Sequence, residues 1–146
     1  MRTVVALVTF LVAGCSGVDN GETQVRWLDS QTFVSEVQPV LAERCGNPSC
    51  HGRQDRPFAI YSQRNWRMDP ARTFLAEPLS DEELAHNYNT SCVFVSEADM
   101  PAETLLLLKP LADWAGTSHG GGVIFDGTTD PDYELLLRWI QQGWTE

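Results

Sequence analysis

The sequence predicts an all-α fold of about four helices joined by long loops. Apolar residues recur with the helical period in several segments, whereas no run alternates polar and apolar residues long enough to suggest a sheet. The chain of 146 residues is long enough for one small domain. Domains of this size bury a modest share of their surface and often depend on a cofactor or on cross-links.

The N-terminus has the features of an export signal. Arg2 precedes an apolar stretch, Val4 to Val12, that is far too short to span a bilayer. The stretch runs through small residues into Cys15, a pattern that resembles the lipobox at which bacterial lipoproteins are acylated and cleaved. We therefore expect residues 1–14 to be a lipoprotein signal peptide and Cys15 to carry the lipid. Ser16, rather than Asp, favours the periplasmic face of the outer membrane.

The mature chain divides into a tether and a domain. Residues 15–29 are polar, contain glycine and lack apolar periodicity, so they are expected to form a tether, with the domain in 30–146. The formal charge of −10 argues against nucleic acid as a partner, because phosphates would be repelled. The membrane is thus expected to be reached through the lipid and not through a basic patch.

The first two helices follow from apolar faces and caps. A helix from Gln31 to Arg44, behind a possible cap at Ser30, should be kinked at Pro39. Its apolar face consists of Phe33, Val37, Val40 and Leu41. A second helix begins at Ser80, where Glu83 completes a capping box. Its expected buried side consists of Leu84, Tyr88 and Cys92.

Two shorter helices complete the domain. One is expected from Ala102 to Lys109, and Pro110 ends it. The last opens with Asp130 as cap and Pro131 in the first turn, and it ends at Gly143. The apolar face of this last helix consists of Tyr133, Leu136, Leu137 and Ile140. The loops 52–69 and 111–129 are long for so small a domain, which suggests that something else organises them.

The clearest chemical signal lies at the end of the first helix. Covalent haem attachment requires two thiols and an imidazole directly after the second thiol, which reaches the iron. Cys45 offers the first thiol, and Cys50 with His51 offers the second thiol and the imidazole. Four residues separate the two cysteines, where the usual motif has two.

The chain resembles small bacterial c-type cytochrome domains, notably the planctomycete-type cytochrome C family. The resemblance covers the segment from Phe33 to Gly52 and, later in the chain, three blocks in the same order. These blocks are Leu105 to Pro110, Ser118 to Gly122 and Asp132 to Gly143. It implies a cytochrome c-like fold around haem c, with Cys45, Cys50 and His51 holding the haem, His51 as proximal iron ligand, and single-electron transfer to an unknown redox partner.

The sixth ligand of such a haem has three candidates. His119 is favoured because it lies twenty residues before Trp139, and the glycines 120–122 would let the backbone approach the porphyrin closely. Met100 is the alternative, although it lies far ahead of the last helix. His86 ranks last, since its helical position suggests that it faces water.

Cys92 remains unpaired in this scheme, and the simplest expectation is a buried thiol. The rival is a haem-free lipoprotein module with a disulfide from Cys92 to Cys45 or Cys50 and a binding or structural role. A third reading is a metal site of Cys45, Cys50 and Cys92 with His51 or His119. No nucleophile–base arrangement or phosphate loop stands out, so an electron carrier is expected and not an enzyme.

Overall fold

The computed structural model describes residues 24–96, 98–111 and 118–144. The expected signal peptide at 1–14 and the expected lipidation site Cys15 lie outside these residues. In the described part of the chain, no helix is long and apolar enough to cross a membrane. The described residues are mostly helical and contain no β-strand, in agreement with the predicted all-α class.

The first helical segment runs from Ser30 to Arg44 without interruption, and a π-helical turn lies inside it. Its three parts are α1 (Ser30–Thr32), the π turn η1 (Phe33–Val37) and α2 (Gln38–Arg44). The predicted cap at Ser30 is wrong, because the Asp29 side chain accepts the cap hydrogen bond from the Thr32 N–H at 2.6 Å. The π turn lies just before Pro39, whose missing N–H and bulky ring disturb the preceding α-helical hydrogen bonds.

The second long helix, α3 (Asp81–Val95), begins as predicted. Ser80 and Glu83 form a reciprocal capping box. The predicted buried face is only partly correct, because Cys92 is fully buried but Leu84 and Tyr88 are half-buried. The residues most buried on α3 are largely polar: Glu83, Asn87, Ser91, Cys92 and Val95. Hydrogen bonds to neighbouring segments satisfy these buried polar side chains. The pattern of apolar residues in the sequence therefore could not predict this buried face.

The expected helix from Ala102 to Lys109 is divided in two. A 3-10 turn, η3 (Pro101–Glu103), precedes the short α4 (Leu105–Leu108). Thr104 between them is extended and fully buried, and its hydroxyl donates to the Pro101 carbonyl at 3.0 Å. This hydrogen bond competes with helix formation at Thr104.

The last helix, α5 (Pro131–Gln142), is confirmed at both ends. Asp130 caps it by accepting from two backbone N–H groups, and it ends at Gly143. Its fully buried residues are Tyr133, Leu136, Trp139 and Ile140, so Trp139 joins the predicted face and Leu137 is half-buried.

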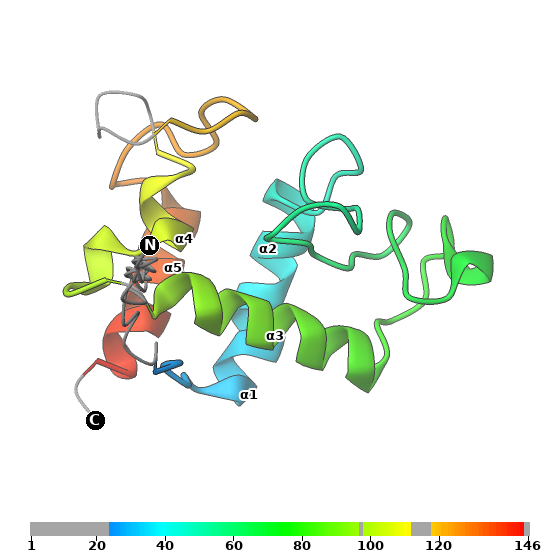
Figure 1. Ribbon diagram of the computed structural model, residues 1–146, viewed down its shortest axis with the longest axis horizontal. Helices are drawn as coiled ribbons and strands as arrows, with labels where there is room; N and C mark the ends of the chain where they lie inside the picture. The colour runs from blue at the N-terminus through cyan, green and yellow to red at the C-terminus, as the bar shows by residue number, and fades with distance from the viewer. Residues whose placement is uncertain (1–23, 97, 112–117, 145–146) are drawn as a thin grey trace, which may run out of the picture.

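The helices pack around one apolar core. Figure 1 shows α3 crossing the first helical segment, with α4 and α5 gathered beside them. Phe33 lies at the centre, where its ring contacts Tyr88 of α3 and Trp139 of α5. A buried ion pair attaches the loop after His51 to this core. Arg67 donates two hydrogen bonds to Glu83, and their side chains are 0% and 2% exposed.

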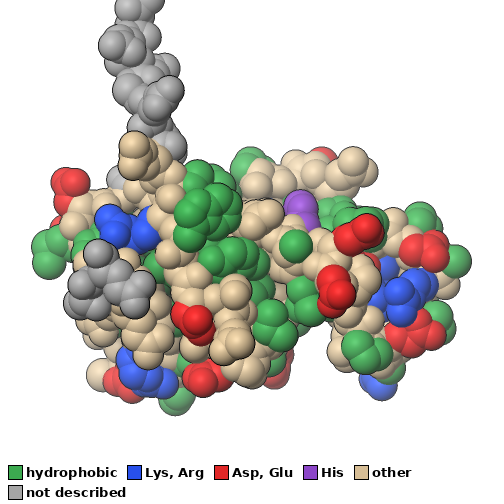
Figure 2. All heavy atoms as spheres, turned by 90° about the horizontal axis from the view of Figure 1, so that it is seen from below, with side chains coloured by type: hydrophobic (Ala, Val, Ile, Leu, Met, Phe, Trp, Pro, Cys, Tyr) green, Lys and Arg blue, Asp and Glu red, His purple; other side chains and the backbone are tan. Residues whose placement is uncertain are grey.

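The part of the loop between His51 and α3 that lies farthest from the core carries both basic and acidic side chains. Figure 2 shows basic and acidic groups side by side at one end of the molecule. Near the 3-10 turn η2 (Pro70–Arg72), Arg72 and Glu77 form an ion pair. Phe74 is 81% exposed beside them.

The described end of the expected tether packs against the domain. Leu28 is buried in the core, and the Arg26 N–H donates to the Ser96 hydroxyl at 2.6 Å. Val25 and Leu28, which lie in the expected tether, therefore pack on the core of the domain.

Candidate functional site

The segment from Cys45 to Gly52 forms a compact loop at the end of α2. The Asn47 carbonyl accepts from the N–H groups of Cys50 and Gly52, and the Cys45 carbonyl accepts from the His51 N–H at 3.1 Å. The Asn47 side chain also accepts from Ser49. The four residues between the cysteines are thus folded into a turn that returns Cys50 and His51 to the end of the helix.

Two glycines make this return possible. A Cβ added at Gly52 would lie 2.2 Å from the Gly46 carbonyl oxygen, and one added at Gly46 would lie 2.7 Å from the Ala42 carbonyl oxygen. Both obstacles are backbone atoms, which cannot move aside as a flexible side chain can. The loop can close only because both positions lack a side chain.

His51 is oriented by a hydrogen bond to its own loop. Its Nδ1 lies 2.6 Å from the Phe58 carbonyl oxygen, which can only accept, so Nδ1 carries the hydrogen and Nε2 carries the lone pair. Burial lowers the pKa of His51, and the nearby His119 and Arg56 lower it further against the effect of this hydrogen bond. His51 is therefore held as a neutral imidazole with Nε2 free to bind a metal.

His119 reaches the same place from a much later part of the chain. The N–H groups of Ile124 and Phe125 both donate to the Pro110 carbonyl and close the base of the loop that carries it. The His119 Nδ1 lies 2.9 Å from the Gly122 carbonyl oxygen. In the neutral ring, this carbonyl contact places the hydrogen on Nδ1 and the lone pair on Nε2.

The two imidazoles point at each other. The Nε2 atoms of His51 and His119 are 3.5 Å apart, and the two rings are within 13° of parallel. Neither Nε2 carries a hydrogen when both rings are neutral, so a proton or a metal between them is needed to make the contact favourable.

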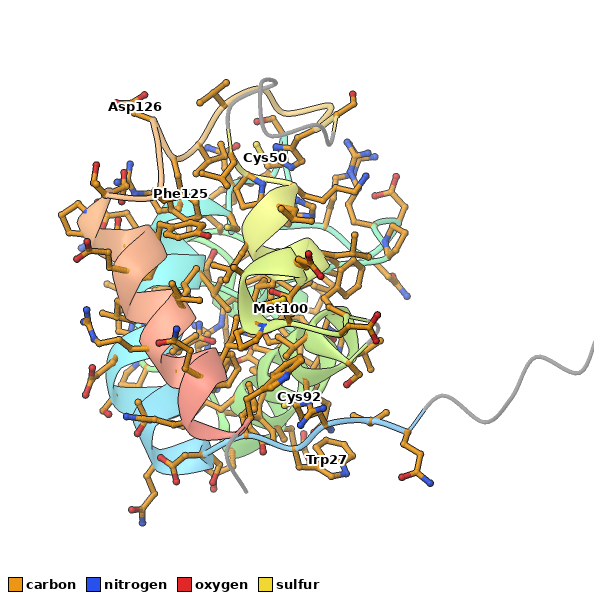
Figure 3. All side chains as sticks on the ribbon, turned by 90° about the vertical axis from the view of Figure 1, so that its left-hand side faces the viewer. Trp27, Cys50, Cys92, Met100, Phe125 and Asp126 are labelled. Atoms are coloured by element: carbon orange, nitrogen blue, oxygen red, sulfur yellow. The ribbon has the colours of Figure 1, made fainter. Side chains whose placement is uncertain are left out.

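An apolar cavity adjoins the pair. Cys45, Cys50, His51 and His119 all lie on its wall, and its volume is about 70 Å³. Apolar side chains from four helices and two loops make up most of the rest, among them Leu41, Phe58, Phe94, Leu106, Phe125 and Leu136. Figure 3 shows Cys50 and Phe125 at the same end of the molecule. A mostly apolar lining with a few fixed polar groups is typical of a ligand site.

The Cys45 thiol faces this cavity in its protonated form. Burial raises its pKa to about 12, and the proximity of Cys50 adds to the rise. The two thiols are therefore close enough to influence each other, yet no disulfide joins them.

The two rival candidates for a sixth ligand lie elsewhere. Met100 is 58% exposed and does not line the cavity. His86 is half-buried and not turned to water as predicted, because its Nε2 contacts the Ala59 carbonyl at 3.0 Å and its ring packs against Tyr61 and Trp66. Of the three candidates, only His119 meets His51.

Cys92 lies apart from the other cysteines. It is fully buried in the core, as predicted for a structural thiol, and Figure 3 shows it at the opposite end from Cys50. Cys45, Cys50 and Cys92 are all free thiols. Among the described residues, no group of three His, Cys, Asp or Glu side chains could hold a metal ion, so the predicted four-ligand site is not formed.

Sequence reasoning missed the residues that aim the two histidines. The carbonyl oxygens of Phe58 and Gly122 are backbone groups and leave no mark on residue types. The glycine at 122 was a signal, although it was attributed to contact with a ligand.

No family model, curated protein or solved structure was found to match the chain. The interpretation of the site therefore depends on its residues and geometry.

Proposed function

We propose that this protein is a membrane-anchored c-type cytochrome that transfers single electrons. Cys45 and Cys50 would bind the haem covalently, and His51 and His119 would bind its iron. The observation that carries the proposal is the pair of opposed Nε2 atoms, 3.5 Å apart on the wall of an apolar cavity that both thiols also face.

The donor set fits haem better than it fits a bare metal ion. Metal–imidazole bonds are about 2 Å long, so two imidazoles on opposite sides of one iron need Nε2 atoms about 4 Å apart. The observed separation is about half an ångström shorter, an adjustment within reach of a loop residue such as His119. Two imidazoles alone would leave a bare ion with few protein ligands, whereas a porphyrin supplies four more.

Each residue then has a defined task. The hydrogen bond from Nδ1 to the Phe58 carbonyl holds His51 in the tautomer that binds metal and increases its basicity. The apolar side chains exclude water, which together with the axial ligands sets the reduction potential. The haem supplies an iron that cycles between ferrous and ferric, and no other chemistry is required of the protein.

The cell envelope is the proposed location, on the basis of the lipobox-like sequence ending in Cys15. A lipid at this residue would hold the domain near the membrane through the segment before residue 24. The redox partner is an unidentified protein that can approach a domain of strongly negative charge.

The decisive experiment is a pyridine haemochrome spectrum with a haem-stained denaturing gel, on the full chain matured in cells that attach c-type haem. We expect a covalent band with a c-type spectrum. Cys50→Ala should abolish it, and Cys92→Ser should leave it intact as a matched control. Colourless, folded wild-type protein would overturn the proposal and direct attention to the haem-free, disulfide-bonded module. Covalent haem retained in Cys50→Ala would exclude Cys50 as an attachment site.

A further inference from the structure

The turn from His119 to Gly122 is closed by two hydrogen bonds between its ends. The Gly122 N–H donates to the His119 carbonyl at 2.9 Å, and the His119 Nδ1–H donates back to the Gly122 carbonyl at 2.9 Å. The imidazole is thereby fixed to its own backbone. The direction of Nε2 follows from the conformation of the residue at 122.

Gly122 has a backbone conformation that other residues avoid. Its φ is +81°, and a Cβ added there would meet no atom within 4 Å. Glycine is thus needed for the backbone angle and not for space. Alanine would push this residue away from positive φ and turn its carbonyl away from the His119 Nδ1.

Gly121 acts by a different route. An added Cβ would lie 3.1 Å from Cε1 of His119, 3.5 Å from Nδ1 and 3.7 Å from Nε2. The backbone at 121 therefore lies against the imidazole itself. A methyl group would push the ring aside by a few tenths of an ångström.

We propose that Gly121 and Gly122 are positioning residues for His119, which together aim its Nε2 at His51. This positioning role rests on the proposed function only for the identity of the group that binds between the two imidazoles. Gly120 provides the matched control, because an added Cβ meets nothing within 4 Å and its φ is ordinary.

The first test uses the haem-loaded full chain and carbon monoxide as the probe. Carbon monoxide must displace His119 from ferrous iron, so its apparent affinity rises as His119 is held less well. We expect about tenfold tighter binding in Gly122→Ala, from the cost of positive φ, and a smaller increase in Gly121→Ala. Gly120→Ala should bind like the wild type. Wild-type affinity in both Gly121→Ala and Gly122→Ala would overturn the proposal, as would an equal change in Gly120→Ala.

The second test needs no haem and separates this proposal from the proposed function. Long-range ¹H–¹⁵N correlation spectra of haem-free protein at pH 9 report which ring nitrogen of His119 carries hydrogen. We expect the Nδ1–H tautomer in the wild type and in Gly120→Ala, and a mixture in Gly122→Ala. A mixture already in the wild type would refute the positioning role. Absence of covalent haem would refute only the proposed function.

Discussion

The Nε2 atoms of His51 and His119 face each other across 3.5 Å, although 68 positions separate the two residues in the chain. Each ring is turned by a backbone carbonyl that accepts from its Nδ1, Phe58 for one and Gly122 for the other. The same arrangement therefore occurs twice, once at the end of α2 and once in the loop before α5. Two imidazoles oriented in this way are the pair that would bind the iron of the proposed haem.

Replacement of His119 should change the haem spectrum more than replacement of any other candidate ligand. His119→Ala in the haem-loaded protein removes the imidazole opposite His51, so we expect loss of the low-spin absorption bands while covalent attachment persists. Met100→Leu is the matched control and should leave the spectrum unchanged, because Met100 is exposed away from the cavity. The reverse pattern in the visible spectra would identify Met100 as the ligand.

Gly52→Ala should destabilise the protein severely. The new methyl group would overlap the Gly46 carbonyl oxygen, a backbone atom that cannot withdraw without opening the loop that carries Cys50 and His51. We expect a loss of about 3 kcal/mol or more in the free energy of unfolding, measured by urea denaturation of haem-free protein. Gly127→Ala, whose Cβ meets nothing within 4 Å, should be close to neutral. Equal stability of the two variants would contradict the crowding seen at Gly52.

Arg67→Ala should also be costly, for an electrostatic reason. The variant leaves the Glu83 carboxylate buried without its charged partner, and breaking one side of a buried ion pair costs about 3–5 kcal/mol. Urea denaturation of the variant provides the measurement. Arg72→Ala removes an exposed ion pair with Glu77 and serves as the control, with an expected change below about 1 kcal/mol.

The ion pair of Arg67 and Glu83 also makes the free energy of unfolding depend on pH. Burial opposes ionisation of Glu83, but hydrogen bonds from Arg67, Ser80 and Met68 outweigh it and hold its pKa at about 2. The folded-state pKa is below the unfolded value of about 4.3, so this stabilisation is complete above about pH 5 and is lost as the pH falls toward 2. Glu83→Gln should therefore lose less stability than the wild type between pH 5 and pH 3. Parallel losses in urea titrations at both pH values would argue against the lowered pKa.

The Cys45 thiol should resist alkylation while the haem-free protein is folded. Alkylation requires the thiolate, and a pKa of about 12 leaves roughly one thiol in ten thousand ionised at pH 8. With the other cysteines replaced by serine, we expect iodoacetamide to react roughly a thousandfold more slowly than with an ordinary cysteine. The same protein in urea should react at the ordinary rate. Rapid labelling of the folded protein would mean that Cys45 is not shielded.

The sequence was most informative where one local rule decides the structure. The capping box at Ser80 and the aspartate–proline start of α5 are both found where the residue types predicted them. The buried face of α3 was not predictable in this way, since Asn87 is buried through hydrogen bonds to Tyr61 and Gln38, which are far away in the chain. His86 was misjudged for the same reason, because the Tyr61 and Trp66 rings that cover it come from a loop without periodicity.

In the candidate site too, some residues could be predicted from the sequence and others depend on the fold. The thiols and imidazole of Cys45, Cys50 and His51 are adjacent in the sequence, so their grouping needed no knowledge of the fold. His119 could be proposed from its position, but its distance to His51 depends on the backbone contact between Pro110 and Phe125 that closes its loop. Such contacts depend on the path of the chain and leave no trace in composition.

The π turn at Phe33–Val37 changes the direction in which the later residues of this helical segment point. An α-helix turns by about 100° per residue, and a π turn inserts one extra residue without lengthening the segment by a full turn. Both Phe33 at its start and Leu41 after it therefore face the core, and Cys45 follows Leu41 onto the cavity wall. Conversion of the turn to plain α-helix with no residue removed would rotate Cys45 by about 100°, whereas deletion of one residue within the turn would leave Cys45 on the same face. The angular position of the Cys45 thiol is thus determined two to three turns earlier, by the helical distortion beside Pro39.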